Sequence, residues 1–439
     1  MHPSLKALPS TLLIKLILYL SDGLTLFALL EALNSDDIRG PLEHLWQLGR
    51  TCQPTDLWPA LCLGSAFSTM EDPANMTHVE VVLKYHPRVV VEGNVSLEWL
   101  QEHLPSTTTV EWRLGQNGDA CITDQWKSMR VNKLHASKMA QLDSLWHILP
   151  SLTPHLTELV LANSNATSLA PLFDYLATSN VTKLCLVQVQ ENERPLSLSE
   201  HRMWQMINWI QSTPVRCLDL RHCEWRCFDV AEDWYAALLN CPTLETLRLV
   251  QCPRSGVHPK LQSPLALTEV DVDDFTLAQL AAQPGANVET LTLRRPFCDS
   301  FVSFFRKLLN ALPESQVTTL TLSSTALIRR STLMAYVAPL LVPTRLKALV
   351  LSWKVLSSQE AVHIAQAIQA NRTIESLSVR GCRVTHDAIQ ALLECAKNRE
   401  TPMKHISVEM TNEISPDDAE SLYRAAATLG VHLKLDHQS

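Results

Sequence analysis

Glycine, positive charge and long apolar runs are all scarce in this chain of 439 residues. Its 11 glycines leave little room for flexible joints, which fits closely stacked helices and strands. The net charge of −8 argues against a surface built to neutralise nucleic-acid phosphates. The most apolar stretch, residues 12–33, contains Lys15, Asp22 and Glu31, so it does not read as a membrane span. We therefore expect neither nucleic acid nor a membrane as a partner.

The cysteines lack the tight, even spacing of a disulfide framework. Twelve of them are scattered along the chain, which is typical of a reducing compartment where thiols pack as small apolar side chains. We expect a cytoplasmic or nuclear protein. A secreted recognition protein is the alternative, because five Asn-x-Ser/Thr sequons are present. They begin at Asn75, Asn94, Asn165, Asn180 and Asn371.

The motifs of common catalytic sites are also missing from the sequence. It contains no glycine-rich phosphate loop, no His-Glu-x-x-His, no Gly-x-Ser-x-Gly and no paired metal-binding cysteines. His222 and Cys223 are adjacent, and neighbouring residues of a strand face opposite ways, which is poor geometry for a base and a nucleophile. We expect no enzymatic activity and no cofactor.

A six-residue pattern, apolar-x-x-apolar-x-apolar, recurs along two thirds of the chain. Its last four residues predict a short strand whose apolar side chains point inward and whose other side chains face out. Successive starts settle at a spacing of about 29 residues. The pattern begins at Val131, Leu156, Val181, Val215, Leu244, Leu267, Val288, Val317, Leu346, Ile374 and Met403.

Helical patterns lie between these strands. In residues 358–370, for instance, Ala361, Ile364, Ala365 and Ile368 recur at the spacing of one buried helix face. One strand-helix unit cannot bury both of its faces alone, so the units must stack. The sequence therefore predicts an α/β solenoid with parallel strands on the concave face and helices on the convex face.

Residues 374–395 (IESLSVRGCRVTHDAIQALLEC) resemble the ribonuclease-inhibitor or cysteine-containing type of leucine-rich repeat. The resemblance extends from Leu156 to the C-terminus. In that family the ninth position of each unit is often Asn or Cys, and here it holds Cys223, Cys252 and Cys382. The same register places Cys217 and Cys223 on different sides of the unit. This argues against a zinc site formed by Cys217, His222, Cys223 and Cys227, which also lacks a second ligand pair.

The outward positions of the middle strands carry charge. If the concave face recognises a protein partner, these side chains are the candidates for binding it. They are Asp219, Arg221, Arg248, Asp271, Asp273 and Arg294. The alternative is structural, because Asp219, Arg248 and Asp271 occupy one column of adjacent strands about 5 Å apart and can pair with one another as a solvated ladder. Exposed pairs of this kind contribute only about 0 to 1 kcal/mol.

The N-terminal segment has an unusually apolar first helix. Over residues 11–20 only Thr11, Lys15 and Tyr19 are polar, and they form one narrow column. A second apolar helix follows over residues 24–33, with Ser21 or Asp22 as its cap. We expect one core-facing stripe, and the remaining apolar strip of Ile14 and Leu18 suggests a partner. The core-facing stripe comprises Leu12, Leu13, Leu16, Ile17 and Leu20.

The stretch LPSTLLIKLILYL resembles the opening of an F-box, and Leu57-Trp58 resembles its close. The resemblance implies docking on the Skp-type adaptor of a cullin-based ubiquitin ligase. The residues that it assigns to adaptor docking are Leu8, Pro9, Leu12, Leu13, Leu16, Ile17 and Leu20. The chain would then be the substrate-recognition subunit in a ubiquitin-like conjugation pathway. The alternative is a repeat scaffold with no ligase link, whose residues 1–63 form only a helical cap.

These patterns predict three segments. Residues 1–63 form the F-box-like helical module, and residues 131–439 form the leucine-rich-repeat solenoid. Residues 64–130 are divergent first repeats or a connector, with strands expected at 88–91 and 109–114 and a helix at 97–104. The identity of the partner cannot be read from side chains that specify only a surface.

Overall fold

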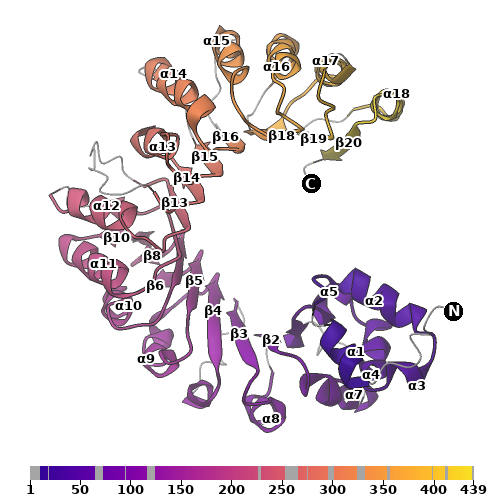
Figure 1. Ribbon diagram of the computed structural model, residues 1–439. Helices are drawn as coiled ribbons and strands as arrows, with labels where there is room; N and C mark the ends of the chain where they lie inside the picture. The colour runs from indigo at the N-terminus through magenta and orange to yellow at the C-terminus, as the bar shows by residue number, and fades with distance from the viewer. Residues whose placement is uncertain are drawn as a thin grey trace. The chain divides into compact units, whose positions relative to one another are not determined.

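The computed structural model has a mixed α/β fold with a large parallel sheet of 15 strands (Figure 1). It describes residues 10–437 apart from 18, 65–72, 94, 116–123, 226–228, 253–264, 274, 295–300, 324–331, 353–355, 398 and 411–413. Two compact units divide the chain, Met1–Ser197 and Leu198–Ser439. This division differs from the predicted segments, because the first unit holds both the N-terminal helices and the first strands of the sheet.

The first unit begins with short helices packed on one another. Asp22 caps the second helix by accepting a hydrogen bond from Thr25 N at 2.7 Å. Arg39 is buried, donates from Nε to Leu30 O at 2.7 Å, and pairs through Nη1 with Glu43 at 2.6 Å. The helices are α1 (Ser10–Ile17), α2 (Gly23–Ala32), α3 (Asp36–Arg39), α4 (Leu42–Gly49), α5 (Pro54–Leu57) and α7 (Pro73–Leu83).

Six strands of the first unit follow one another in chain order in the parallel sheet. They are β1 (Leu61–Cys62), β2 (Arg88–Glu92), β3 (Thr109–Leu114), β4 (Val131–Ser137), β5 (Glu158–Ala162) and β7 (Lys183–Val187). Between them lie α8 (Leu97–His103), η3 (Asp124–Ser128), η4 (Asp143–Leu145), α9 (Leu149–Leu152) and α10 (Ala170–Leu176). Strands β6 (Asn165–Ala166), β8 (Gln190–Glu191) and β9 (Arg194–Pro195) form a separate small sheet. The strands and helix predicted within residues 64–130 are confirmed.

Nine strands of the second unit also lie in chain order. They are β11 (Cys217–Arg221), β13 (Thr246–Val250), β14 (Glu269–Val272), β15 (Thr290–Arg294), β16 (Thr319–Ser323), β17 (Ala348–Ser352), β18 (Ser376–Cys382), β19 (His405–Met410) and β20 (His432–His437). The short strands β10 (Ser197–Leu198) and β12 (Glu224–Trp225) lie outside this sheet. Every strand predicted from the six-residue pattern is therefore present.

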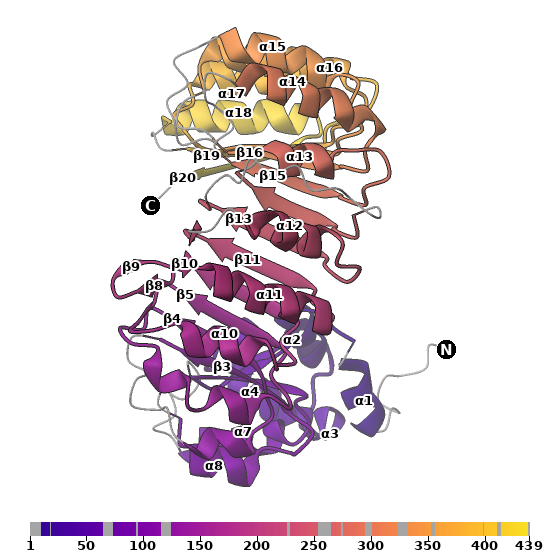
Figure 2. The ribbon, with the colours of Figure 1, turned by 90° about the vertical axis from the view of Figure 1, so that its left-hand side faces the viewer.

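Helices alternate with these strands and line one side of them (Figures 1 and 2). They are α11 (Glu200–Ser212), α12 (Ala231–Leu239), α13 (Phe275–Ala281), α14 (Phe301–Ala311), η5 (Leu312–Glu314), α15 (Thr332–Leu341), α16 (Ser358–Ala370), α17 (His386–Lys397) and α18 (Pro416–Thr428). In α16 the predicted face of Ala361, Ile364, Ala365 and Ile368 is buried. A capping box of Ser357 and Glu360 fixes where this helix begins.

In several described units the turn after the strand repeats in backbone conformation but not in side chain. The eighth position of these units has a left-handed φ, for example +56° at Lys138, +49° at Asn163 and +61° at His222. The amide of this residue donates to the next strand's end, as in Asn163 N to Val187 O at 2.8 Å and His222 N to Val250 O at 2.9 Å. The turns at Asn163 and His222 are thereby tied to the next unit by a backbone hydrogen bond.

Asn371 stands at the C-terminal end of α16 and ties that helix to the preceding unit. Its side chain is 1% exposed, and Nδ2 donates to Leu341 O at 2.9 Å and Thr344 O at 3.0 Å. Its Oδ1 accepts from Thr373 N at 2.8 Å and Ile374 N at 2.9 Å. The amide nitrogen of this sequon is therefore occupied and enclosed in the folded chain.

We expect Asn371→Ala to lower the free energy of unfolding by about 2 to 4 kcal/mol, because several buried backbone groups lose their partner. Urea unfolding followed by circular dichroism measures the loss. Asn180→Ala is the control, since this exposed asparagine makes a single long bond to Thr153 O at 3.3 Å. Equal losses in the two variants would contradict the structural role of Asn371.

We expect the buried His86 to make the stability of the first unit depend on pH. Its ring is 1% exposed and lies 5.1 Å from the Trp58 ring, centroid to centroid. Burial lowers the pKa of His86 to about 4, and a contact with the Arg88 backbone offsets part of this effect. In the unfolded chain the histidine binds a proton near pH 6.5, whereas in the folded chain it does so only near pH 4. The contribution of His86 to the unfolding free energy is therefore fully present above pH 6.5 and is lost as the pH drops toward 4.

We expect acidification from pH 7.5 to 5 to remove about 2 kcal/mol of unfolding free energy through His86. Urea unfolding at the two pH values measures the difference. His86→Phe keeps a ring in the core and should shrink that difference by the same amount, whatever its stability at pH 7.5. An unchanged difference in this variant would exclude His86 as its source.

Candidate protein-interaction surfaces

Helix α1 buries only part of the stripe that the sequence assigned to the core. Leu13 and Ile17 are 1% and 0% exposed, whereas Leu12 and Leu16 are 44% and 46% exposed. The prediction of a single core-facing stripe is therefore wrong for Leu12 and Leu16. Leu20 is half-buried, and Leu8, Pro9 and Leu18 lie outside the described residues.

The exposed apolar residues gather in one part of the sequence. Among the described residues, four of the seven large apolar side chains that are exposed belong to residues 12–24. We call them the N-terminal apolar face: Leu12, Leu16, Tyr19 and Leu24. Tyr19 is 87% exposed and Leu24 69% exposed, so both are almost fully accessible to solvent. Leu12 and Leu16 are one helical turn apart on α1, and neighbouring exposed apolar side chains mark interaction sites more often than isolated ones do.

The end of the N-terminal segment holds α1 and α2 in place. Leu57 and Trp58 are buried, and Trp58 Nε1 donates to Leu20 O at 2.8 Å. Helix α2 begins at Gly23, where a Cβ would lie 2.3 Å from Pro54 O, so only glycine allows this close approach. The Leu-Trp pair is thus part of the core that orients the N-terminal apolar face.

The predicted column of charge on the second unit is present in the sheet register. Asp219 is opposite Arg248, and Arg248 is opposite Asp271. The acidic members are not solvated, however, since Asp219 is 3% and Asp271 4% exposed. The alternative of a solvated ladder is therefore wrong for these two carboxylates.

Of the predicted ion pairs, Arg248–Asp219 is present, whereas the second partner of Arg248 is Glu269 instead of Asp271. Asp219 accepts two hydrogen bonds from Arg221, at 2.7 and 2.8 Å, and Asp271 accepts two from Arg294 at the same distances. Arg248 pairs with Glu269 at 2.8 Å and with Asp219 at 3.4 Å. We call this set the strand-face ion cluster. It comprises Asp219, Arg221, Arg248, Glu269, Asp271 and Arg294.

Two arginines of the cluster, Arg248 and Arg294, have raised pKa values. Burial lowers the pKa of Arg248, but the carboxylates of Glu269 and Asp219 outweigh burial and hold that pKa above its ordinary value. Hydrogen bonds to Asp271 raise the pKa of Arg294. Two-point contacts between a guanidinium and a carboxylate also fix the side-chain orientation. The second unit therefore presents ordered charges on its strands.

Asp273 has a different role from the recognition role predicted for it. Its side chain is buried, and Oδ2 accepts from Gln251 N at 2.7 Å. Gln251 occupies the left-handed turn position, with φ of +56°. At Lys138, Asn163 and His222 the corresponding amide donates to a backbone carbonyl of the next unit, so the Asp273 carboxylate replaces that carbonyl at this turn.

A second charged cluster, on the strands of the first unit, was missed from the sequence. Glu111 on β3 is 1% exposed and contacts Arg88, Arg113 at 2.7 Å and Lys133 at 3.8 Å. Burial raises its pKa, and the hydrogen bonds from Arg88 and Arg113 outweigh this and lower it overall. The alternating charges of Glu111 and Arg113 were a signal, but the strands there lack the six-residue pattern.

Two of the three cysteines predicted at the ninth position of a unit, Cys223 and Cys252, have side chains that the structure describes. Cys223 is buried, Cys252 is half-buried, and their contact raises the pKa of the Cys223 thiol well above its ordinary value. Cys227 and the side chain of Cys382 lie outside the described residues. Within the described part of the chain, no group of three or more His, Cys, Asp or Glu side chains is placed to hold a metal ion. No helix there is long and apolar enough to span a bilayer.

Neither protein-family models nor curated protein sequences give a match to the chain.

The buried carboxylate of Asp271 is the hydrogen-bond partner of Arg294. We expect Asp271→Ala to cost about 1 to 3 kcal/mol of unfolding free energy, because it leaves the half-buried Arg294 without its carboxylate. Adding Arg294→Ala should recover part of this loss. A double-mutant cycle by urea unfolding measures the coupling, and additive losses would show that the two side chains stabilise the fold independently.

Proposed function

We propose that this chain is the substrate-recognition subunit of a cullin-type ubiquitin ligase. In this proposal the N-terminal apolar face docks on a Skp-type adaptor, and the strand face of a leucine-rich-repeat solenoid binds the protein to be modified. The chain then acts as a binding subunit without catalytic residues of its own. Its place of action is the cytoplasm or the nucleus.

The observation that carries the proposal is the outward position of Leu12 and Leu16. Because Leu13 and Ile17 fill the core, α1 cannot bury the other two leucines by rotating. Burying a leucine side chain stabilises a complex by roughly 1.5 to 3 kcal/mol. The N-terminal apolar face therefore favours association with an apolar partner surface, and the resemblance of this stretch to an F-box indicates which partner.

The strand-face ion cluster supports the recognition part of the proposal. Its arginines are already held by Asp219, Glu269 and Asp271, so a partner meets charges in fixed positions. Ordered charges of alternating sign discriminate between partners chiefly by repelling those with the wrong pattern. The cluster thus fits selective binding of a protein surface better than strong attraction of any polyanion.

A second candidate is a repeat scaffold with no ligase link. The observation in its favour is the continuity of the N-terminal helices with the sheet. Strand β1 pairs with β2 directly after α5, and Tyr85 Oη donates to Pro41 O at 3.3 Å between α7 and the start of α4. Helices that cover the first strand in this way are what a solenoid cap requires.

Adaptor binding separates the two candidates. We expect the intact chain to bind a purified Skp-type adaptor at micromolar concentration in surface plasmon resonance, and Leu12→Glu/Leu16→Glu to weaken binding by at least about tenfold. Val362→Glu is the matched control, because it places a charge on a side chain of α16 that is also 40% exposed. Both variants should keep the circular dichroism melting curve of the parent.

An intact chain that does not bind the adaptor would overturn the ligase proposal and leave the scaffold. Binding that survives Leu12→Glu/Leu16→Glu would overturn the assignment of the docking surface instead.

A further inference from the structure

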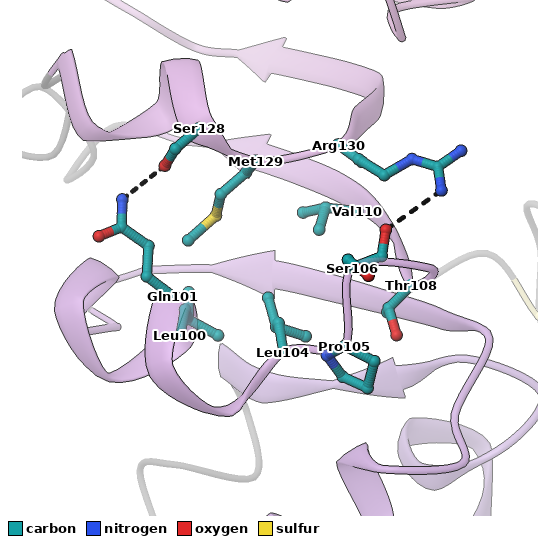
Figure 3. Close-up of a pocket in the computed structure, with 10 residues that line it drawn as sticks. All are labelled: Leu100, Gln101, Leu104, Pro105, Ser106, Thr108, Val110, Ser128, Met129 and Arg130. Carbon is teal, nitrogen blue, oxygen red and sulfur yellow. Dashed lines mark hydrogen bonds between the residues drawn. The ribbon is translucent and has the colours of Figure 1, made fainter.

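A pocket of about 460 Å³ lies in the first unit beside the starts of β3 and β4 (Figure 3). One wall is the end of α8 and the residues that follow it, from Leu100 to Ser106. The other is the segment that leads into β4, residues 128–130. The volume falls within the range of pockets that hold small molecules. It takes no part in the two interaction surfaces described above.

The pocket lies where the sheet register is irregular. Val110 pairs with Val131, but the next residue, Glu111, pairs with Lys133, so β4 carries one extra residue at Asn132. An extra residue of this kind bends its strand and re-aims the side chains beside it. The segments that precede β3 and β4 are the two sides of this pocket.

The floor of the pocket is apolar. Its accessible apolar surface comes from Leu104 and Pro105, which are half-buried, whereas Leu100, Val110 and Met129 are 0%, 1% and 7% exposed and already covered by the protein. In Figure 3, Met129, Val110 and Leu104 lie between the Gln101–Ser128 and Arg130–Ser106 hydrogen bonds. A floor of this kind takes an aliphatic group, and methionine adapts readily to its shape.

Polar bridges close the two ends. Gln101 Nε2 donates to Ser128 Oγ at 2.6 Å and to Gln125 O at 3.0 Å. At the other end Arg130 Nη1 donates to Ser106 O at 3.1 Å (Figure 3). The Thr108 hydroxyl is also engaged, since it donates to His86 O at 3.1 Å. A peptide in the pocket would therefore find these rim groups already engaged.

Arg130 is the charged residue of the lining. It is exposed, and its guanidinium has five N–H groups, of which the bond to Ser106 uses one. Planar guanidinium groups match carboxylates in geometry and charge. We propose that the pocket binds a medium-chain aliphatic carboxylate, with the chain against the accessible side chains of Leu104 and Pro105 and the carboxylate on Arg130.

Octanoate is the probe, and isothermal titration calorimetry of the full chain measures its dissociation constant. We expect octanoate to bind more tightly than octanamide, which has the same length and no charge. Arg130→Gln should weaken octanoate by about fivefold, the effect of one exposed ion pair, and leave octanamide unchanged. Leu104→Asp should weaken both probes.

Arg194→Gln is the matched control, because Arg194 is an exposed arginine of the same unit outside the pocket. It should leave the affinity for octanoate unchanged. No heat of binding at about 1 mM octanoate, or binding that neither Arg130→Gln nor Leu104→Asp alters, would overturn the proposal. A peptide with a free C-terminal leucine that binds at least about tenfold more tightly than octanoate would overturn it in favour of a protein ligand.

Discussion

The in-register stacking of apolar strand residues is the constraint on which the second unit depends. One buried column runs through Leu220, Leu249, Val272, Leu293, Leu322 and Leu351 on consecutive strands. These side chains are covered only when both neighbouring strands are in the same register, since a shift by one residue would turn them outward. The helix layer, the turns and the exposed face of the sheet all follow from that register.

Strand stacking also determines which charged side chains pair and which are buried. Parallel strands lie close enough for every outward residue to touch the one beside it, so Arg248 must meet Asp219. Flanking side chains then cover the short aspartates while the longer arginines keep partial contact with water. Removing one partner of such a pair leaves an unpaired, partly buried charge, which is costly. The pairs therefore favour this one register of the strands more than they add to the unfolding free energy.

The strands and most helices were predictable because their signal is local and periodic. The burial of Asp219 and Asp271 was not predictable, since it depends on how the flanking side chains of neighbouring strands cover these carboxylates. The left-handed turn was hidden as well, because Lys138, Gln188 and His222 share a conformation and no chemistry. Which side of α1 faces the core could not be predicted from the sequence, since apolar residues lie on nearly every side of this helix and its polar column is narrow.

The two candidate surfaces therefore differ in which of their side chains are still exposed to water and could gain from contact with a partner. On the strand face, the carboxylates and guanidinium groups already satisfy one another, so a partner gains little from any single charge and must fit the pattern as a whole. On the N-terminal apolar face, Leu12 and Leu16 are only partly covered by the described residues, and more water is released when another surface covers them. In the proposed function, the apolar face is therefore the source of affinity and the strand face the source of selectivity.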